Sequence, residues 1–120
     1  MTVGEIARAL NAEILAAGRM NESVTGVYAG DIMSRALANG FSGMAWICAQ
    51  ADMTALAVAH MKGALCLIFP QGVLPGEAVV RRAEEEKIGL LSCGLTAFEA
   101  AGRIYALMQE EERGTGNADA

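Results

Sequence analysis

The chain has 120 residues, of which 53% are hydrophobic, so it can bury one substantial core but is short for two domains. Its formal net charge of −5 and its pI near 4.8 argue against nucleic-acid binding, because phosphate backbones are bound by clustered Lys and Arg. No apolar run approaches the length of a membrane span, and the first residues lack a cationic segment followed by an apolar core. We therefore expect one cytoplasmic domain that binds neither nucleic acid nor membrane.

Helices and strands are predicted to follow one another along the chain. Two helix starts carry capping-box pairs, since Thr2 with Glu5 and Thr96 with Glu99 have the spacing in which side chains bond to each other's backbone N–H groups. In chain order, we predict a helix over 2–10, strands over 12–16 and 24–28, a helix over 31–38, a strand over 45–48, a helix over 52–61, a strand over 65–69, a helix over 77–87, a strand over 89–92 and a helix over 96–108.

Three of these strands, 45–48, 65–69 and 89–92, are short and almost wholly apolar. About twenty residues separate each from the next, which is the spacing of parallel strands joined by helical crossovers. We predict an α/β fold over residues 1–112, a single domain with a mostly parallel sheet of four or five strands and helices on both faces. The polar tail, 113–120, is expected to be disordered. A site is expected where the strands end, because parallel sheets bind ligands at their carboxyl ends.

Two helices raise the question of what covers them. The helix over 52–61 is apolar nearly all round, which predicts a sheet on one side and another subunit on the other. Around it, Met44, Met53 and Met61 either fill the core or form an exposed seam for self-association. The inner face of the last helix is predicted to consist of Phe98, Ala101, Ile104, Tyr105 and Met108.

Four segments together resemble the DRTGG domain, a small α/β module found in longer bacterial proteins. They are Gly30–Ser34, Trp46–Ala59, Pro75–Glu77 and Leu95–Arg103, within a resemblance that covers about residues 2–108. The chain is most similar to the stand-alone members, some of which occur beside redox and hydrogenase genes. In other relatives the module accompanies CBS domains of regulated pyrophosphatases, and the amino-terminal domain of HPr kinase/phosphorylase has a similar fold. The resemblance implies a regulatory or assembly module that is usually dimeric.

The residues that give the family its name are changed in this chain. Gln50-Ala51-Asp52 replaces the Asp-Arg pair, and Pro70-Gln71-Gly72 replaces the Thr-Gly-Gly turn. Neither alanine nor glutamine supplies the bidentate fork of arginine. Proline has no N–H to offer an anion, and Gln71 is expected to resist a positive φ. If the family site binds phosphate, this copy is expected to bind it weakly.

The candidate ligand-binding residues all lie at strand ends or helix starts. Each of Asp31, Asp52 and Thr96 also has a structural explanation as a helix N-cap. At a helix amino terminus, Thr96 could instead contact an anionic ligand. The full candidate set is Gly30, Asp31, Ser34, Gln50, Asp52, Gln71, Gly72 and Thr96.

His60 and the three cysteines give little support for catalysis or metal binding. His60 lies in an apolar helix without a Ser or Cys at a useful spacing, so we expect a packed or edge histidine. The odd number of cysteines, without a CxxC, predicts buried reduced thiols, and a zinc site would lack a fourth ligand. No Walker A, GxGxxG or HExxH motif occurs. We predict no catalytic residue, metal or cofactor.

The preferred functional prediction is a non-enzymatic regulatory or assembly module. It would form a homodimer and bind a protein partner, with a role in redox or hydrogenase metabolism that the resemblance implies. The alternative is a sensor of an adenine nucleotide or another anion. A third, weaker alternative is an enzyme with Asp31 or Asp52 as its acid–base group. The sequence identifies neither the partner nor the ligand.

Overall fold

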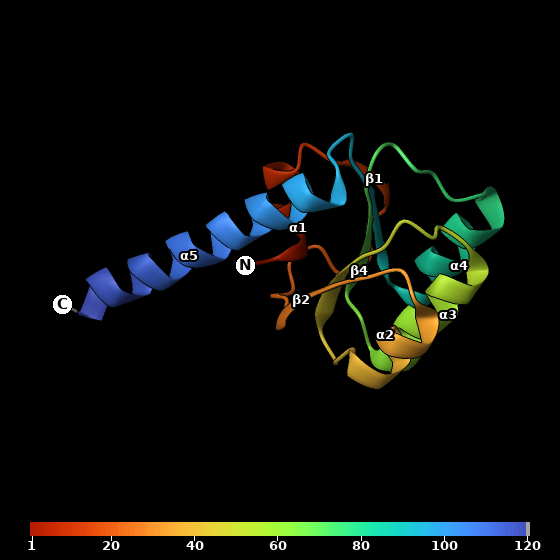
Figure 1. The fold of residues 1–120 in the computed structure, drawn as a ribbon, viewed down its shortest axis with the longest axis horizontal. Helices are drawn as coiled ribbons and strands as arrows, with labels where there is room; N and C mark the ends of the chain where they lie inside the picture. Colours follow the sequence, from red (N-terminus) through yellow and green to blue (C-terminus); the bar gives the residue numbers. More distant parts are fainter. Residues whose placement is uncertain (120) are drawn as a thin grey trace.

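The computed structural model describes residues 1–119. One five-stranded sheet lies between two groups of helices (Figure 1). In chain order the elements are α1 (Val3–Ala9), β1 (Glu13–Ala16), β2 (Gly26–Ala29), α2 (Met33–Asn39), β3 (Met44–Ile47), α3 (Met53–Lys62), β4 (Cys66–Phe69), α4 (Glu77–Glu86), β5 (Gly89–Ser92) and α5 (Ala97–Asp119). The prediction of a single α/β domain is confirmed.

The strand order is β1-β5-β4-β3-β2, in which β2, β3, β4 and β5 pair in parallel. Only β1 is antiparallel, and it pairs with β5 at one margin of the sheet. All residues of β3, β4 and β5 are buried, as is usual for parallel strands covered by helices on both faces. The three apolar runs of the sequence therefore form the centre of the sheet.

Successive side chains of a strand point to opposite faces, so the sheet contributes to two cores. On one face, Met44 and Trp46 of β3 pack with α2, α3 and α4. On the other, Ala45 and Ile47 pack with α1 and α5. The expectation of helices on both faces is confirmed.

The last helix differs from its prediction in two respects. Beginning after Thr96, α5 continues past Met108 to Asp119, so it runs through most of the segment 113–120 that was expected to be a tail. Whether this segment is disordered in solution stays a prediction, and Ala120 lies outside the described residues. Phe98 and Tyr105, predicted to face inward, are 76% and 63% exposed.

Of Met44, Met53 and Met61, one lies in the core and two lie at the surface, while their part in self-association stays a prediction. Met44 is fully buried, whereas Met53 and Met61 on α3 are 44% and 69% exposed. Since α3 packs only one side against the sheet, its other side lies at the surface. None of the helices among residues 1–119 is both long enough and apolar enough to cross a membrane.

Candidate functional site

The loops after β2 and β3 meet at the carboxyl edge of the sheet, where Asp31 was expected to cap a helix. It does not, because α2 begins after Ile32 and has no side-chain cap. Instead, Asp31 Oδ1 accepts a hydrogen bond of 2.8 Å from the backbone N–H of Ala49. Beside it, Trp46 Nε1 donates to the carbonyl oxygen of Gly30 at 2.8 Å. Gly30 and Asp31 thus join two neighbouring loops.

Asp52 caps α3 as expected. Its Oδ1 accepts from the backbone N–H of Ala55 at 3.0 Å, and its Oδ2 accepts from Gln50 Nε2 at 2.8 Å. Both carboxylate oxygens therefore bond within the loop that follows β3. Gln50 and Asp52, two of the eight candidate residues, are thus hydrogen-bonded to each other.

The turn after β4 corrects the expectation for Gln71, which was that this side chain would resist a positive φ. Gln71 adopts φ 56° and Gly72 φ 71°. Their backbone N–H groups point to the loop after β5, where Gln71 donates to Leu95 O and Gly72 to Cys93 O, each at 2.7 Å. The two donors that could have bound an anion are thus occupied by carbonyl groups of the chain itself.

Thr96 forms the predicted capping box with Glu99. Glu99 N donates to Thr96 Oγ1 at 3.1 Å, and Thr96 N donates to Glu99 Oε1 at 3.0 Å. The bond from the Thr96 backbone lowers the pKa of Glu99 below its ordinary value, with smaller contributions from the Thr96 hydroxyl and from Arg103. Capping gives both residues a structural role at the start of α5.

The candidate residues thus fall into two groups of loops rather than one pocket. The loops after β2 and β3 are joined through Asp31, and the loops after β4 and β5 are joined through Gln71 and Gly72. Ser34 lies exposed on α2. The five cavities that we describe in residues 1–119 are not lined by any of the eight candidates.

All three cysteines are buried and free, as predicted. Burial raises the pKa of Cys66 to about 12. Burial also raises that of Cys48 to about 11, with a smaller contribution from the nearby Asp31 carboxylate. Such thiols stay protonated near neutral pH and react slowly. Within the described part of the chain, no group of three or more His, Cys, Asp or Glu could hold a metal ion.

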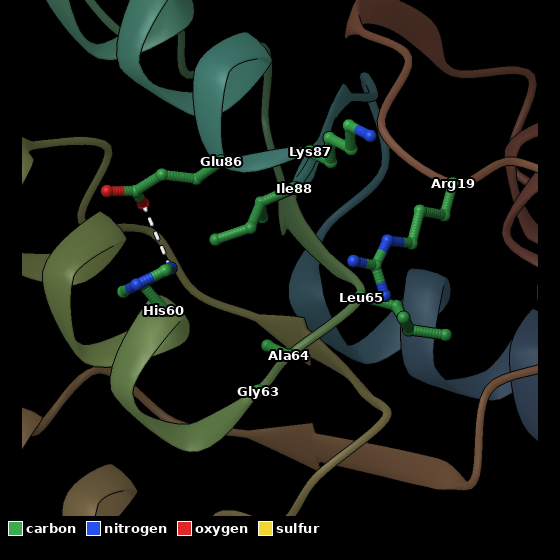
Figure 2. A pocket seen from close by; sticks show the side chains of 8 residues that line it. All are labelled: Arg19, His60, Gly63, Ala64, Leu65, Glu86, Lys87 and Ile88. Carbon is green, nitrogen blue, oxygen red and sulfur yellow. Dashed lines mark ion pairs between the residues drawn. The ribbon is translucent and has the colours of Figure 1, made fainter.

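A cavity of about 180 Å³ lies at the opposite, amino edge of the strands, beside the ends of α3 and α4 (Figure 2). His60 Nδ1 lies 3.4 Å from Glu86 Oε2, while Arg82 Nε donates to Glu86 Oε1 at 2.8 Å. Glu86 Oε2 is buried and has no hydrogen-bond partner among the described residues. The sequence did not predict Glu86 as a partner of His60, because the two side chains meet only when successive crossover helices end side by side.

The charged side chains around this cavity are explained by their positions at helix ends and do not require a catalytic role. The C-terminus of a helix carries a partial negative charge, which cationic side chains offset. His60 and Lys62 lie in the last turn of α3, and Lys87 is the C-cap of α4. Arg19 completes the basic lining. His60 has a carboxylate to orient it, but the cavity lining includes no Ser, Thr or Cys that could serve as a nucleophile.

No protein-family model matches the sequence, and no curated protein matches it. Among solved structures, the fold is similar to the CBS and DRTGG domains of the regulatory region of a Clostridium perfringens pyrophosphatase, crystallised with its activator, diadenosine tetraphosphate. The TM-score is 0.69 at 16% sequence identity, over 86% of this chain and 45% of that chain. The present chain thus matches less than half of that crystallised chain. At this sequence identity, the likeness shows a similar fold and nothing more.

Proposed function

We propose that this chain is a non-enzymatic, DRTGG-like regulatory or assembly module that acts through dimerisation and binding of a protein partner. One observation supports this proposal most directly. At the carboxyl edge of the sheet, the N–H groups of Ala49, Gln71 and Gly72 all donate within the chain. Because these three donors are occupied, they are not free to bind an anion at the usual ligand position of a parallel sheet.

An enzymatic role has weaker support. A general base needs hydrogen-bond reach to a reacting group. Asp31 and Asp52 instead bond to backbone N–H groups as structural acceptors. His60 is paired with Glu86 at the other edge of the sheet. We therefore propose no catalytic residue.

A nucleotide sensor is the second candidate, and the structural neighbour favours it. That neighbour is a regulatory region crystallised with diadenosine tetraphosphate, named there as an activator. If this chain binds such a ligand, the exposed residues Asp31, Ser34 and Thr96 at the carboxyl edge are the proposed contacts. Binding would then have to compete with the loop-to-loop hydrogen bonds described above.

Two measurements on the full chain separate the candidates. A thermal-shift panel would use ATP, AMP, diadenosine tetraphosphate and inorganic phosphate, and sedimentation velocity would report the oligomeric state. An interaction module predicts a dimer and no shift. A sensor predicts a shift that rises with ligand concentration, because ligand binding stabilises the folded state, and that disappears in Asp31→Ala.

The location and the partner are proposed from the sequence. We propose a cytoplasmic protein whose partner belongs to redox or hydrogenase metabolism, as the resemblance to stand-alone DRTGG modules implies. The identity of the adjacent genes tests this directly. Neighbours without any redox or hydrogenase enzyme would leave this part of the proposal without support.

A further inference from the structure

The two edges of the sheet differ in how they are protected from pairing with another strand. At one edge, β1 begins with the exposed Glu13, and its register with β5 is irregular between Ile14 and Ala16. Charged side chains and bulges are common devices against edge-to-edge pairing. At the other edge, β2 has the sequence Gly-Val-Tyr-Ala, without a charge or a proline, and it pairs with β3 in unbroken register. The β2 edge therefore lacks both devices.

Gly26 and Tyr28 carry the backbone groups that point outward from this edge. In a parallel pair, alternate residues of a strand bond to the neighbouring strand. Thr25 N donates to Gly43 O at 2.9 Å, so Thr25 and Val27 bond toward β3. The N–H and C=O groups of Gly26 and Tyr28 then point away from the sheet, and neither residue makes a backbone hydrogen bond to any other element among residues 1–119. Two donors and two acceptors thus remain available at this edge.

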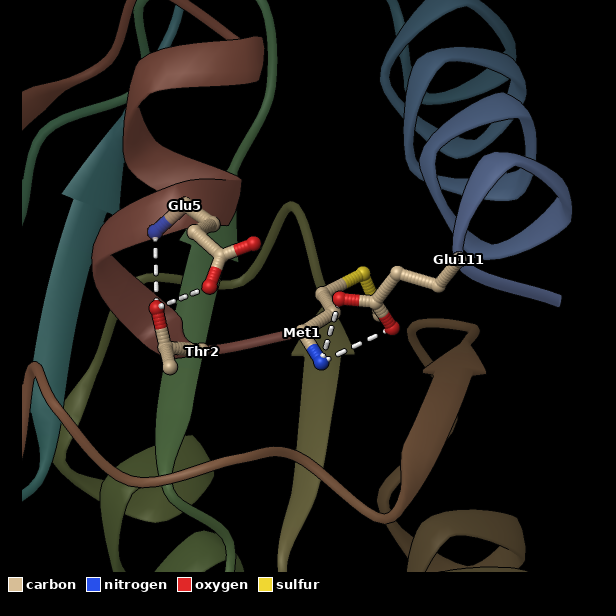
Figure 3. Close-up of polar contacts among 4 residues, drawn as sticks. All are labelled: Met1, Thr2, Glu5 and Glu111. Atoms are coloured by element: carbon tan, nitrogen blue, oxygen red, sulfur yellow. Dashed lines mark hydrogen bonds and ion pairs between the residues drawn. The ribbon is translucent and has the colours of Figure 1, made fainter. Parts of the chain in front are cut away.

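The amino terminus covers the chain just before β2 and so limits the open edge. Val24 N donates to Met1 O at 2.9 Å. The amino group of Met1 forms an ion pair of 2.7 Å with Glu111 of α5, which fixes this segment (Figure 3). A cavity of about 480 Å³ adjoins Gly26, between β2 and α5. The open edge therefore begins at Gly26, with space beside it.

The open groups are complementary to those of a second copy of the same strand. In antiparallel pairing, two directly opposed residues can exchange both of their N–H···O=C bonds. With a twofold axis at Val27, Gly26 faces Tyr28 of the second copy and Tyr28 faces its Gly26, so both pairs exchange both bonds. An axis at Gly26 or at Tyr28 would join only one such pair. The axis at Val27 therefore uses every available group.

Two further properties of this edge favour a second copy over an unrelated strand. The Phe41 ring lies 3.1 Å from the position of a Cβ on Gly26 and is 36% exposed. In the alignment above, Tyr28 of the second copy covers Gly26 and comes beside Phe41, which is a favourable aromatic cross-strand arrangement. The chain also carries a net charge of −5, so two copies repel each other least where both surfaces are uncharged, as at β2.

We propose that the free edge of β2 is the self-association surface of this protein, and that its occupant is β2 of a second copy in antiparallel orientation. The two five-stranded sheets then form one continuous sheet. This inference rests on the proposed function, because it names the surface through which dimerisation would operate. The paired segment is short, so we expect a dissociation constant of about micromolar order.

Amide hydrogen exchange of the full chain, followed by NMR over a range of protein concentrations, tests the inference. The N–H groups of Gly26 and Tyr28 are expected to exchange about tenfold or more slowly once the dimer predominates, because pairing places both in hydrogen bonds. The N–H of Val27 is the internal control, since it already bonds within the sheet and is expected to change little. Sedimentation velocity on the same samples measures the fraction of dimer.

A pair of substitutions at Tyr28 provides a second measurement. Tyr28→Pro removes an outward N–H, and proline is tolerated in edge strands whose N–H faces solvent. It is expected to weaken the dimer about tenfold or more, because each pair loses a hydrogen bond. Tyr28→Phe is the matched control, since it keeps the N–H and the ring, and it is expected to leave the dimer intact. Circular dichroism checks that each variant is folded, and the exchange rates of the wild type decide if Tyr28→Pro is not.

The outcomes separate this interface from dimerisation itself. A wild-type dimer whose Gly26 and Tyr28 amides exchange as fast as in the monomer overturns the β2 interface and leaves the proposed dimerisation standing. So does a dimer that persists in a folded Tyr28→Pro protein. A wild type that is monomeric at every concentration overturns both.

Discussion

The carboxyl edge of the sheet and the outer side of α5 differ in what their side chains and backbone groups contact. At the sheet edge, Asp31, Gln71 and Gly72 bond to backbone groups of neighbouring loops. On α5, Phe98 and Tyr105 remain exposed, with charged residues beside them. The topology of a parallel sheet marks its carboxyl edge as the ligand position, and here the N–H groups of Ala49, Gln71 and Gly72 at that edge donate within the chain.

The sharpest form of this comparison contrasts two aromatic residues. Trp46 is fully buried and donates to Gly30 O, while Phe98 is 76% exposed. Trp46→Ala is expected to lower the free energy of unfolding by about 3–5 kcal/mol, because it leaves a cavity and an unpaired carbonyl. Phe98→Ala is expected to change it by less than about 0.5 kcal/mol. Urea denaturation followed by circular dichroism measures both, and equal costs would contradict the contrast.

Substitution of Asp31 tests whether this side chain holds two loops together or binds a ligand. Asp31→Ala is expected to lower the free energy of unfolding by about 1–2 kcal/mol, because the N–H of Ala49 loses a charged acceptor. Ser34→Ala, an exposed neighbour on α2, is expected to cost less than about 0.5 kcal/mol. The structural role of Asp31 would be refuted if Asp31→Ala left the stability unchanged but abolished a nucleotide-dependent thermal shift.

Two substitutions in the turn after β4 are expected to change the free energy of unfolding by smaller amounts and in opposite directions. Gln71 holds φ 56°, which strains a residue with a Cβ, so Gln71→Gly is expected to stabilise the protein by about 0.5–1 kcal/mol. Gly72→Ala is expected to destabilise it by about 1 kcal/mol, since the backbone there has φ 71° although space for a Cβ is open. Chemical denaturation of the two variants tests the signs. A stabilising Gly72→Ala would show that this turn is not held as described.

The smallest effect concerns pH and the capping box that begins α5. The folded pKa of Glu99 lies below its unfolded value of about 4.3, so its contribution to stability is present above that pH. It is lost as the pH falls through the folded pKa. Glu99→Gln is expected to remove this part of the acid dependence, because the amide does not titrate. Stability measured from neutral to acidic pH would contradict this if both proteins lost stability in parallel.

Much of the fold could be predicted because its signals are local. The apolar strands 45–48, 65–69 and 89–92 and the caps at Thr2, Asp52 and Thr96 each depend on a few neighbouring residues, and the structure confirms them. Asp31 could not be predicted in the same way, since its bonding partner, Ala49, belongs to the next crossover unit. Nor could the His60–Glu86 pair, which forms only when α3 and α4 end beside each other.

Which side chains of α5 are exposed depended on the tertiary structure even more strongly. Helical spacing predicted one inner face that consists of Phe98, Ala101, Ile104, Tyr105 and Met108, but an inner face needs another element to cover it. Ile104 is buried in the core, and Ala101 and Met108 pack against that core. Phe98 and Tyr105 lie on the side of α5 that this core does not cover, and they are mostly exposed.

The sequence by itself determined the class of fold, one α/β domain with a mostly parallel sheet, because apolar runs at crossover spacing leave few other ways to bury them. It also determined which residues end each strand. Only the tertiary structure decided whether those residues face a ligand or each other, since hydrogen bonds between loops join residues far apart in the chain. The same packing decided that Phe98 and Tyr105 of α5 lie at the surface, because the core covers only the inner side of that helix.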